Sequence, residues 1–288
     1  MGKTAATAIG FIAVLLWALL ALFTAASGSV PPFQLAAMTF ALATLVGLAS
    51  WMFRPGAYKA LRQPWPVWLL GIAGLFGYHF FYFTALRNAP PVEAGLIAYL
   101  WPLLIVLFSA LLPGERIGWH HLVGGALGLA GAVLIVTDGN GFSFKAEYGF
   151  GYAMAAICAF TWSGYSVLSR RFADVPTDII SGFCAVTAVL SLACHLALEQ
   201  SVWPGNGVEW LAVLGLGLGP AGLAFYVWDY GVKNGDIQVL GAASYAAPLL
   251  STLILIATGF APFTWVIALA CGLITLGAVL AAKDMLFQ

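Results

Sequence analysis

Charged residues are scarce in this sequence. Asp, Glu, Lys and Arg make up 8% of its 288 residues, against roughly 25% in a typical soluble domain. The positive and negative charges also balance, so the basic surface that nucleic-acid binding needs is missing. The shortage of charge therefore excludes a soluble fold of this size, and it excludes a nucleic-acid partner.

Cysteine and histidine, which build disulfides and metal sites, are also few. The four cysteines all lie inside apolar stretches and none belongs to a C-x-x-C pair, so they are expected to be small buried side chains. His120 and His121 are adjacent and would point to different faces of a helix. The acids form no cluster, and no nucleophile stands beside a base. The sequence therefore predicts no metal site, no cofactor and no enzymatic activity.

Long apolar runs are what the sequence has in abundance. Hydrophobic residues make up 62% of the chain, and a membrane-spanning helix needs about 20 of them in succession. The charge-free stretches hold ten such segments, once two long runs are divided at SGSVPP (27–32) and TGFAPFTW (258–265). The runs are continuously apolar rather than alternating, which excludes a β-barrel. We expect an all-α polytopic membrane protein with ten transmembrane helices.

The basic residues indicate how the chain enters the membrane. If the N-terminus is cytoplasmic, nine Lys and Arg residues fall on the inside and two, Arg87 and Lys145, on the outside. Both termini are therefore expected in the cytoplasm, with the lipid bilayer as the surroundings of every span. Tryptophans near the predicted span ends, such as Trp119 and Trp265, are expected to be interfacial anchors.

The sequence repeats itself after about half its length. GLIAYLWPLL at 95–104 and GAASYAAPLL at 241–250 lie 146 residues apart and share Gly, Tyr, Pro and two Leu. At an offset of 145 residues, Trp17 corresponds to Trp162. Trp, Tyr and Pro shared at nearly one offset are hard to obtain by chance from apolar segments. The register therefore indicates an internal duplication.

The duplication divides the chain into a first five-helix repeat, 1–140, and a second, 141–288. Five is an odd number, so the second repeat should enter the membrane in the opposite sense. The charges agree, since Arg87 falls outside and its counterpart Lys233 falls inside. Inverted repeats of this kind are typical of secondary transporters, whose substrate sites lie near the midplane between the repeats.

The duplicated ten-span pattern resembles the drug/metabolite transporter superfamily, in its EamA-type branch. Within that branch, EAGLIAYLWPLLIVLFS (93–109) is similar to the fourth span of bacterial aromatic amino acid exporters, with its Y-L-W-P core at 99–102. ATAIGFIAVLLWALL (6–20) and SYAAPLLS (244–251) resemble the same exporters. The resemblance implies a transporter of the bacterial inner membrane that exports aromatic and other neutral amino acids by alternating access around a central cavity. A carrier of the same fold for a sugar, a purine or a toxic compound is the alternative.

The two repeated phrases mark the centre of the predicted substrate site. A proline donates no backbone hydrogen bond, so Pro102 and Pro248 each free the carbonyl one turn earlier and bend the helix. We expect these bends to shape and gate a cavity; kinks that only let the helices pack are the alternative. Rings give an aromatic ligand stacking area, and polar groups orient it. The predicted substrate-binding residues are Trp17, Tyr78, His79, Tyr82, Tyr99, Trp101, Trp162, Ser244 and Ser251.

His79 is the most informative polar residue, because ionisable side chains deep in a membrane usually face a cavity. It is expected to bond the substrate or, less often, to carry a proton; an imidazole bonded to a neighbouring helix is the alternative. Asp229 and Lys233 are expected to pair four residues apart, which leaves no free acid at the centre. Proton coupling, facilitated efflux and exchange therefore all stay open. A channel is not favoured, since the chain carries its own two-fold, and we expect a monomer.

Overall fold

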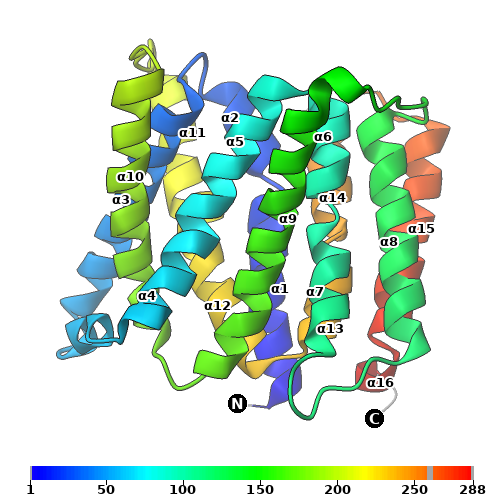
Figure 1. Cartoon of the computed structure of the whole chain (residues 1–288), viewed down its shortest axis with the longest axis horizontal. Coiled ribbons are helices and arrows are strands. Elements are labelled where there is room, and N and C mark those ends of the chain that lie inside the picture. Colours follow the sequence, from blue (N-terminus) through cyan, green and yellow to red (C-terminus); the bar gives the residue numbers. More distant parts are fainter. Residues whose placement is uncertain (1, 258–261, 287–288) are drawn as a thin grey trace.

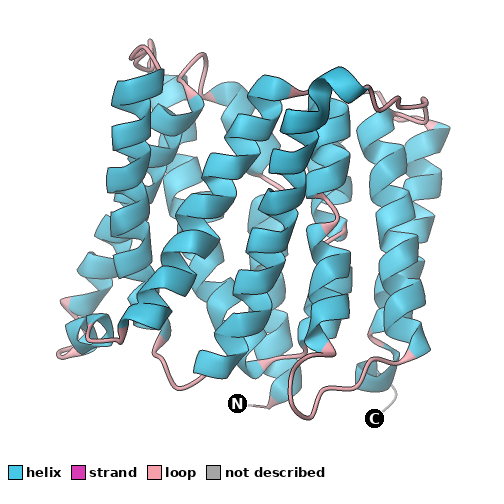
Figure 2. Ribbon diagram, in the orientation of Figure 1, coloured by secondary structure: helices cyan, strands magenta, loops and turns pink. Residues whose placement is uncertain are grey.

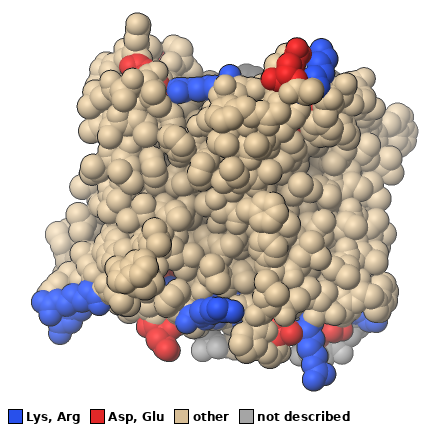
Figure 3. Space-filling view, viewed as in Figure 1, with Lys and Arg blue, Asp and Glu red and all other residues tan. Residues whose placement is uncertain are grey.

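Helices alone build the described part of the chain, residues 2–257 and 262–286, in the computed structural model (Figures 1 and 2). They run side by side, and the first helix begins at the end of the bundle where the last one finishes (Figure 1). Lys, Arg, Asp and Glu gather at the two ends of the molecule, and the middle of the visible face is free of them (Figure 3). This distribution suits a bilayer whose apolar core surrounds the middle of the bundle.

Eight helical segments are long and apolar enough to cross a membrane. They are Lys3–Ala26 (α1, Lys3–Trp17, and α2, Leu20–Ala26), Pro32–Trp51 (α3), Trp65–Asn88 (α4, Trp65–Ile72, and α5, Tyr78–Asn88), Pro91–Ser109 (α6, Pro91–Ala98, and α7, Trp101–Ser109), Trp119–Thr137 (α8), Thr177–Leu198 (ending in α10, Ile180–Leu198), Gly207–Asn234 (α11, Gly207–Leu218, and α12, Ala224–Asn234) and Ile237–Ala257 (α13, Ile237–Ala243, and α14, Ala246–Ala257). The chain is therefore an all-helical, multi-pass membrane protein in its described part.

Two long helices lie beside these eight segments without meeting the same criteria. They are α9 (Gly149–Ser169), which carries several Gly, Ser and Tyr residues, and α15 (Trp265–Ala281), which is 17 residues long. A short helix, α16 (Lys283–Leu286), follows α15. Of the two divisions expected within long apolar runs, the first separates α2 from α3. The second, at 258–265, begins with residues 258–261, which lie outside the described part.

Interruptions of the long helices recur at the offset of the sequence repeat. A π-helical turn at Ala73–Gly77 joins α4 to α5, and another at Gly219–Leu223 joins α11 to α12, 146 residues later. The break before α14 likewise comes 145 residues after the break before α7. Both π-helical turns contain glycine, and a proline lies in the first turn after each of the two breaks; such residues tolerate the loss of regular helical bonds. Pro102 and Pro248 thus follow directly on the two breaks.

Helices from the two parts of the chain pack in reciprocal pairs. α3 packs on α10 and α8 on α15, while α1 packs on α12 and its counterpart α9 packs on α5. A Cβ atom at Gly124 of α8 would lie 2.6 Å from the backbone oxygen of Gly277, and one at Gly277 would lie 2.6 Å from that of Gly124. The two backbones meet at this point, which only residues without side chains permit.

Glu199 holds the start of α3 from a distant part of the chain. Its carboxylate accepts the backbone N–H groups of Phe33 and Gln34, each at 3.1 Å. Arg87 at the end of α5 and His195 of α10 also bond this carboxylate. A negative charge at a helix N-terminus satisfies free N–H groups and opposes the helix dipole. Glu199 therefore ties α3, α5 and α10 together at one end of the bundle.

Ion pairs also join distant segments at the end where α1 begins. Lys3 pairs with Asp236 at 2.8 Å, and Arg170 pairs with Glu115 at 2.7 Å. Burial disfavours the charged form of Asp236, but the ammonium of Lys3 outweighs it and holds the pKa of that carboxyl below its ordinary value. Asp236 also accepts the first backbone N–H groups of α13. The same carboxylate therefore starts a helix and holds the N-terminal segment.

Candidate functional site

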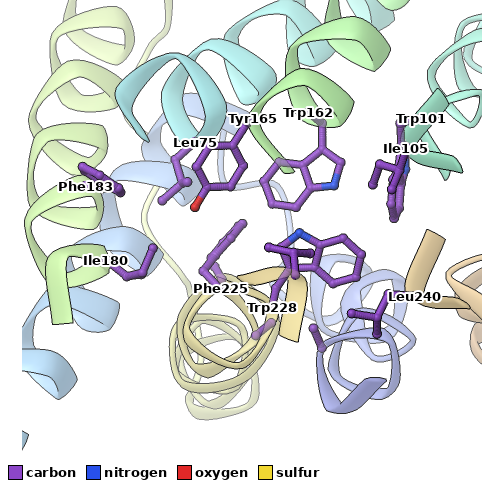
Figure 4. Packing of buried hydrophobic residues seen from close by; sticks show 14 of the residues in the cluster. Leu75, Trp101, Ile105, Trp162, Tyr165, Ile180, Phe183, Phe225, Trp228 and Leu240 are labelled. Atoms are coloured by element: carbon purple, nitrogen blue, oxygen red, sulfur yellow. The ribbon is translucent and has the colours of Figure 1, made fainter. Parts of the chain in front are cut away.

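Five aromatic rings from α1, α7, α9 and α12 meet inside the bundle. We call them the central ring cluster: Trp17, Trp101, Trp162, Phe225 and Trp228. The ring of Trp17 lies 6.0 Å from Trp101 and 5.7 Å from Trp162, edge to face in both cases. Trp162 stacks on Trp228 at 6.1 Å. Figure 4 shows Trp162 and Trp228 facing each other, with Trp101 to one side. Edge-to-face and offset arrangements are the favourable ones for aromatic pairs.

The polar atoms of this cluster divide into two groups. The indole N–H of Trp17 donates to the backbone oxygen of Pro220 at 3.2 Å, and that of Trp228 donates to Ser166 Oγ at 3.1 Å. Within the described residues, the indole N–H groups of Trp101 and Trp162 have no such partner. Two of the four tryptophans are therefore bonded into the fold, while the other two keep a free donor.

Three tyrosines extend the cluster through Trp162. Tyr78 lies 5.5 Å from Trp162, and Tyr82 stacks on Tyr78 at 6.0 Å with nearly parallel planes. Tyr99 lies close enough to both Tyr78 and Tyr82 for their side chains to interact electrostatically. All three rings are half-buried, and no protein group in the described part hydrogen-bonds their hydroxyls. Unbonded hydroxyls in low-polarity surroundings are costly, so this group is suited to a polar ligand.

His79 is held by its own helix. Its Nδ1 lies 2.7 Å from the backbone oxygen of Leu75. A carbonyl oxygen only accepts, so Nδ1 carries the proton and Nε2 of the neutral ring is left as an acceptor. The ring packs edge-on against Phe40 at 5.0 Å and also contacts Tyr78 and Phe225. The bond runs back to the π-helical turn that precedes α5, not to a neighbouring helix as in the alternative considered above.

The two proline breaks are joined by a hydrogen bond between helices. Tyr245, which lies in the break before α14, is fully buried. Its hydroxyl accepts the backbone N–H of Leu103, in the first turn of α7, at 3.2 Å. The first N–H groups of a helix have no partner within it, so Tyr245 caps α7 from another helix. Pro102 and Pro248 are both buried close by, in the first turns of α7 and α14.

Removing the Tyr245 hydroxyl should loosen this junction. We expect Tyr245→Phe to lower the free energy of unfolding by about 1 kcal/mol, because the Leu103 N–H loses its acceptor in a medium that offers few others. Reversible unfolding in mixed micelles measures the change. The matched control is Tyr58→Phe, which changes an exposed ring in the short 3-10 helix before α4. Equal stability of the two variants would contradict the capping role.

The structure places the two predicted serines outside the central ring cluster. Ser244 is fully buried, and its hydroxyl donates to the backbone oxygen of Leu240 at 2.7 Å. Its backbone oxygen, which Pro248 leaves without the usual partner, accepts the N–H of Ala247 instead. Ser251 lies half-buried on α14, and within the described part no ring contact or hydrogen bond joins it to the cluster. Neither hydroxyl is positioned as the tyrosine hydroxyls are.

Sequence reasoning missed Phe225 and Trp228, although a signal for both was present. At the offset of 146 residues, Phe225 corresponds to His79 and Trp228 to Tyr82. Both of those counterparts were predicted site residues, so the repeat register would have added Phe225 and Trp228. Asp229 follows Trp228 directly, so this ring lies at the edge of a charge-free run.

A buried charged pair follows Trp228 on α12. Asp229 pairs with Lys233 at 2.9 Å, as the spacing predicts, and Thr177 also donates to Asp229 at 2.7 Å. A cavity of about 10 Å³ lies beside this pair, lined in part by Tyr165 and Ser169. That volume suits one water molecule at most. Within the described residues, no group of three or more His, Cys, Asp or Glu is placed to hold a metal ion.

Comparisons with known proteins point to one family. The model of the EamA-like transporter family matches residues 4–137 and again residues 149–283. The aromatic amino acid exporter YddG of Ancylobacter novellus is 57% identical over 282 residues, 98% of each chain. The exporter of the same name from Escherichia coli is 26% identical over 268 residues, 88% of each chain.

Two further comparisons bear on cargo and fold. The pseudopaline exporter CntI of Pseudomonas aeruginosa is 29% identical over 205 residues, which are 69% of this chain and 68% of that one. A solved crystal structure, 57% identical, superposes with a TM-score of 0.93 and covers 98% of this chain and 99% of its own. The fold is therefore shared with an experimental structure over nearly the whole length.

Proposed function

Because this chain belongs to the EamA-like transporter family, we propose that it exports aromatic and other neutral amino acids across the bacterial inner membrane. The single observation that carries the proposal is the arrangement of donors beside the central ring cluster. The hydroxyls of Tyr78, Tyr82 and Tyr99 and the indole N–H groups of Trp101 and Trp162 have no hydrogen-bond partner within the described protein. Contacts between rings link Tyr82, Tyr78, Trp162 and Trp101, so these donors belong to one group of rings that offers stacking surface.

This arrangement suits an amino acid with an aromatic side chain. The hydroxyls and indole N–H groups would donate to the substrate carboxylate, and His79 Nε2 would accept from its ammonium. The substrate ring would take the place of one of the contacts among the cluster rings. We assign no substrate contact to Ser244, whose hydroxyl already donates to Leu240 of α13.

We further propose ten membrane spans arranged as two inverted five-helix repeats, 1–140 and 141–288. The helices α9 and α15 would complete the eight spans already described. Three observations support this arrangement: the family model matches the chain twice, the helix interruptions recur after about half the chain, and the packed pairs are reciprocal. An even total of ten spans keeps both termini on one side, and the basic residues favour the cytoplasmic side.

Transport would proceed by alternating access, with a single copy of the chain as the working unit. The two helix breaks lie next to the site, where Pro102 and Pro248 leave the backbone weakest, and they would absorb the bending as the site opens to one side and then the other. The ion pairs at each end of the bundle would form and separate in the course of this exchange.

Counterflow in liposomes tests the proposal. Purified protein is reconstituted into vesicles loaded with unlabelled phenylalanine, and the entry of labelled phenylalanine, tryptophan, threonine and glucose is compared. Aromatic amino acids should accumulate first, in a saturable manner, and protein-free vesicles should show no accumulation. Folded protein that exchanges no amino acid would refute the proposed cargo and favour a sugar, a purine or a toxic compound carried by the same fold.

A further inference from the structure

An apolar groove lies between α7 and α9, away from the central ring cluster. Its volume is about 200 Å³. It is lined by Phe108, Leu111, Leu112, Gly164, Val167, Leu168 and Arg171. Every lining residue except Arg171 is apolar, so the groove is suited to a hydrocarbon chain rather than to water. It lies at the ends of both helices, since α7 ends at Ser109 and α9 at Ser169.

Gly164 gives the groove its depth. A Cβ atom built on Gly164 would meet nothing within 4 Å, so the space in front of this residue is open. The neighbouring residues of α9 on the inward side, including Trp162 and Tyr165, are buried in the bundle. Phe108 closes one wall of the groove by packing on Phe160, with ring centroids 5.8 Å apart. Any larger residue at position 164 would therefore fill the groove without disturbing the protein interior.

Two adjacent arginines follow α9, and they differ in their partners. Arg170 is bound by Glu115 at 2.7 Å and donates to the backbone oxygen of Gly235. Arg171 is exposed, and no carboxylate of the described residues forms an ion pair with it. Arg171 lies seven residues beyond Gly164 along the chain, which is about 10 Å for helical residues. The groove thus has an apolar floor and an unpaired positive charge at its mouth.

From this geometry we propose that the groove binds one anionic phospholipid. An acyl chain lies along Gly164 and the apolar wall, and the phosphate of the head group pairs with Arg171. An apolar slot within the bilayer and a cation where the helix leaves it match the two parts of such a lipid. The bound lipid spans α7 and α9, so it contacts both proposed repeats.

Native mass spectrometry of the full-length protein with added lipid tests the proposal. Phosphatidylglycerol and phosphatidylethanolamine with the same acyl chains are compared. Phosphatidylglycerol should bind more tightly, and Arg171→Gln should weaken its binding about fivefold, the effect expected of one basic residue near an anionic head group. Arg62→Gln, another exposed arginine without an ion pair in the described structure, is the matched control and should change binding less than twofold.

A second pair of variants tests the apolar part of the groove. Gly164→Leu should abolish the bound lipid whatever its head group, because the new side chain occupies the place of the acyl chain. Gly272→Leu adds the same side chain at an exposed helical glycine of α15, also with open space in front of it, and should leave binding intact. Four outcomes would each overturn the proposal. The two lipids could bind equally, or the two arginine variants could have equal effects. Gly164→Leu could retain the lipid, or a lipid-free dimer could be found in place of the lipid-bound monomer.

Discussion

Replacing Trp101 by alanine should reduce phenylalanine counterflow about tenfold, while the protein still reaches the membrane in ordinary amounts. Trp101 contacts Trp17, Trp162 and Trp228 in the central ring cluster. The loss of such ring contacts costs about 1.5 kcal/mol. This free energy corresponds to a factor of about ten in an equilibrium constant. The initial rate of labelled phenylalanine entry, normalised to the amount of protein in the vesicles, is the measurement.

Two controls separate a role in transport from a role in packing. Trp265→Ala removes a tryptophan that is 88% exposed and lies far along the chain from the cluster, so its transport rate should stay within twofold of the original protein. Trp101→Phe keeps a buried aromatic ring but removes the unbonded indole N–H. It should therefore fold normally and lose part of the affinity for substrate. Full transport by Trp101→Ala would remove this residue from the site.

The second large effect is expected at the contact between α8 and α15. Gly124→Leu should lower the free energy of unfolding by about 3 kcal/mol, at the upper end of the usual cost of overpacking. The new Cβ alone would lie 2.6 Å from the Gly277 oxygen and 3.0 Å from the Ala281 nitrogen, and neither backbone atom can give way as a side chain does. The thermal unfolding midpoint of the purified protein measures this loss.

Gly272→Leu is the matched control for this substitution as well. It places leucine on the exposed side of α15, where the structure leaves open space, and the unfolding midpoint should hardly move. If Gly124→Leu were as stable as Gly272→Leu, the close approach of α8 and α15 would be wrong. Gly124→Ala should give an intermediate loss, since its single methyl group meets the same backbone atoms.

The sequence predicted the helical class of the fold and most of the central rings, for clear physical reasons. Few charges and long apolar runs leave helices as the simplest solution in a bilayer. Trp17 and Trp162 were found because the repeat pairs them, and Trp101 because the Y-L-W-P phrase marks it. The structure then brings these three rings together. Their role as substrate contacts stays a prediction until transport is measured.

Other features of the site could not be predicted from the sequence, because they depend on which hydrogen bonds form once the helices have packed. Ser244 has the polarity of a ligand contact, but a serine in an apolar helix readily bonds the carbonyl four residues earlier, as it does here with Leu240. The prolines indicated where α7 and α14 would be interrupted. That Tyr245 caps α7 at Leu103 could not be predicted, because the pairing depends on how helices far apart in the chain meet.

That bond also has a consequence for biosynthesis. Tyr245 follows Leu103 by 142 residues, and a ribosome adding ~5–20 residues per second needs on the order of 10–30 s to reach it. Glu199, which holds the start of α3, is likewise made some 165 residues after Gln34. The early helices therefore enter the bilayer with exposed backbone donors that only later helices will satisfy. Until then, water, lipid head groups or the insertion machinery must provide acceptors for these N–H groups.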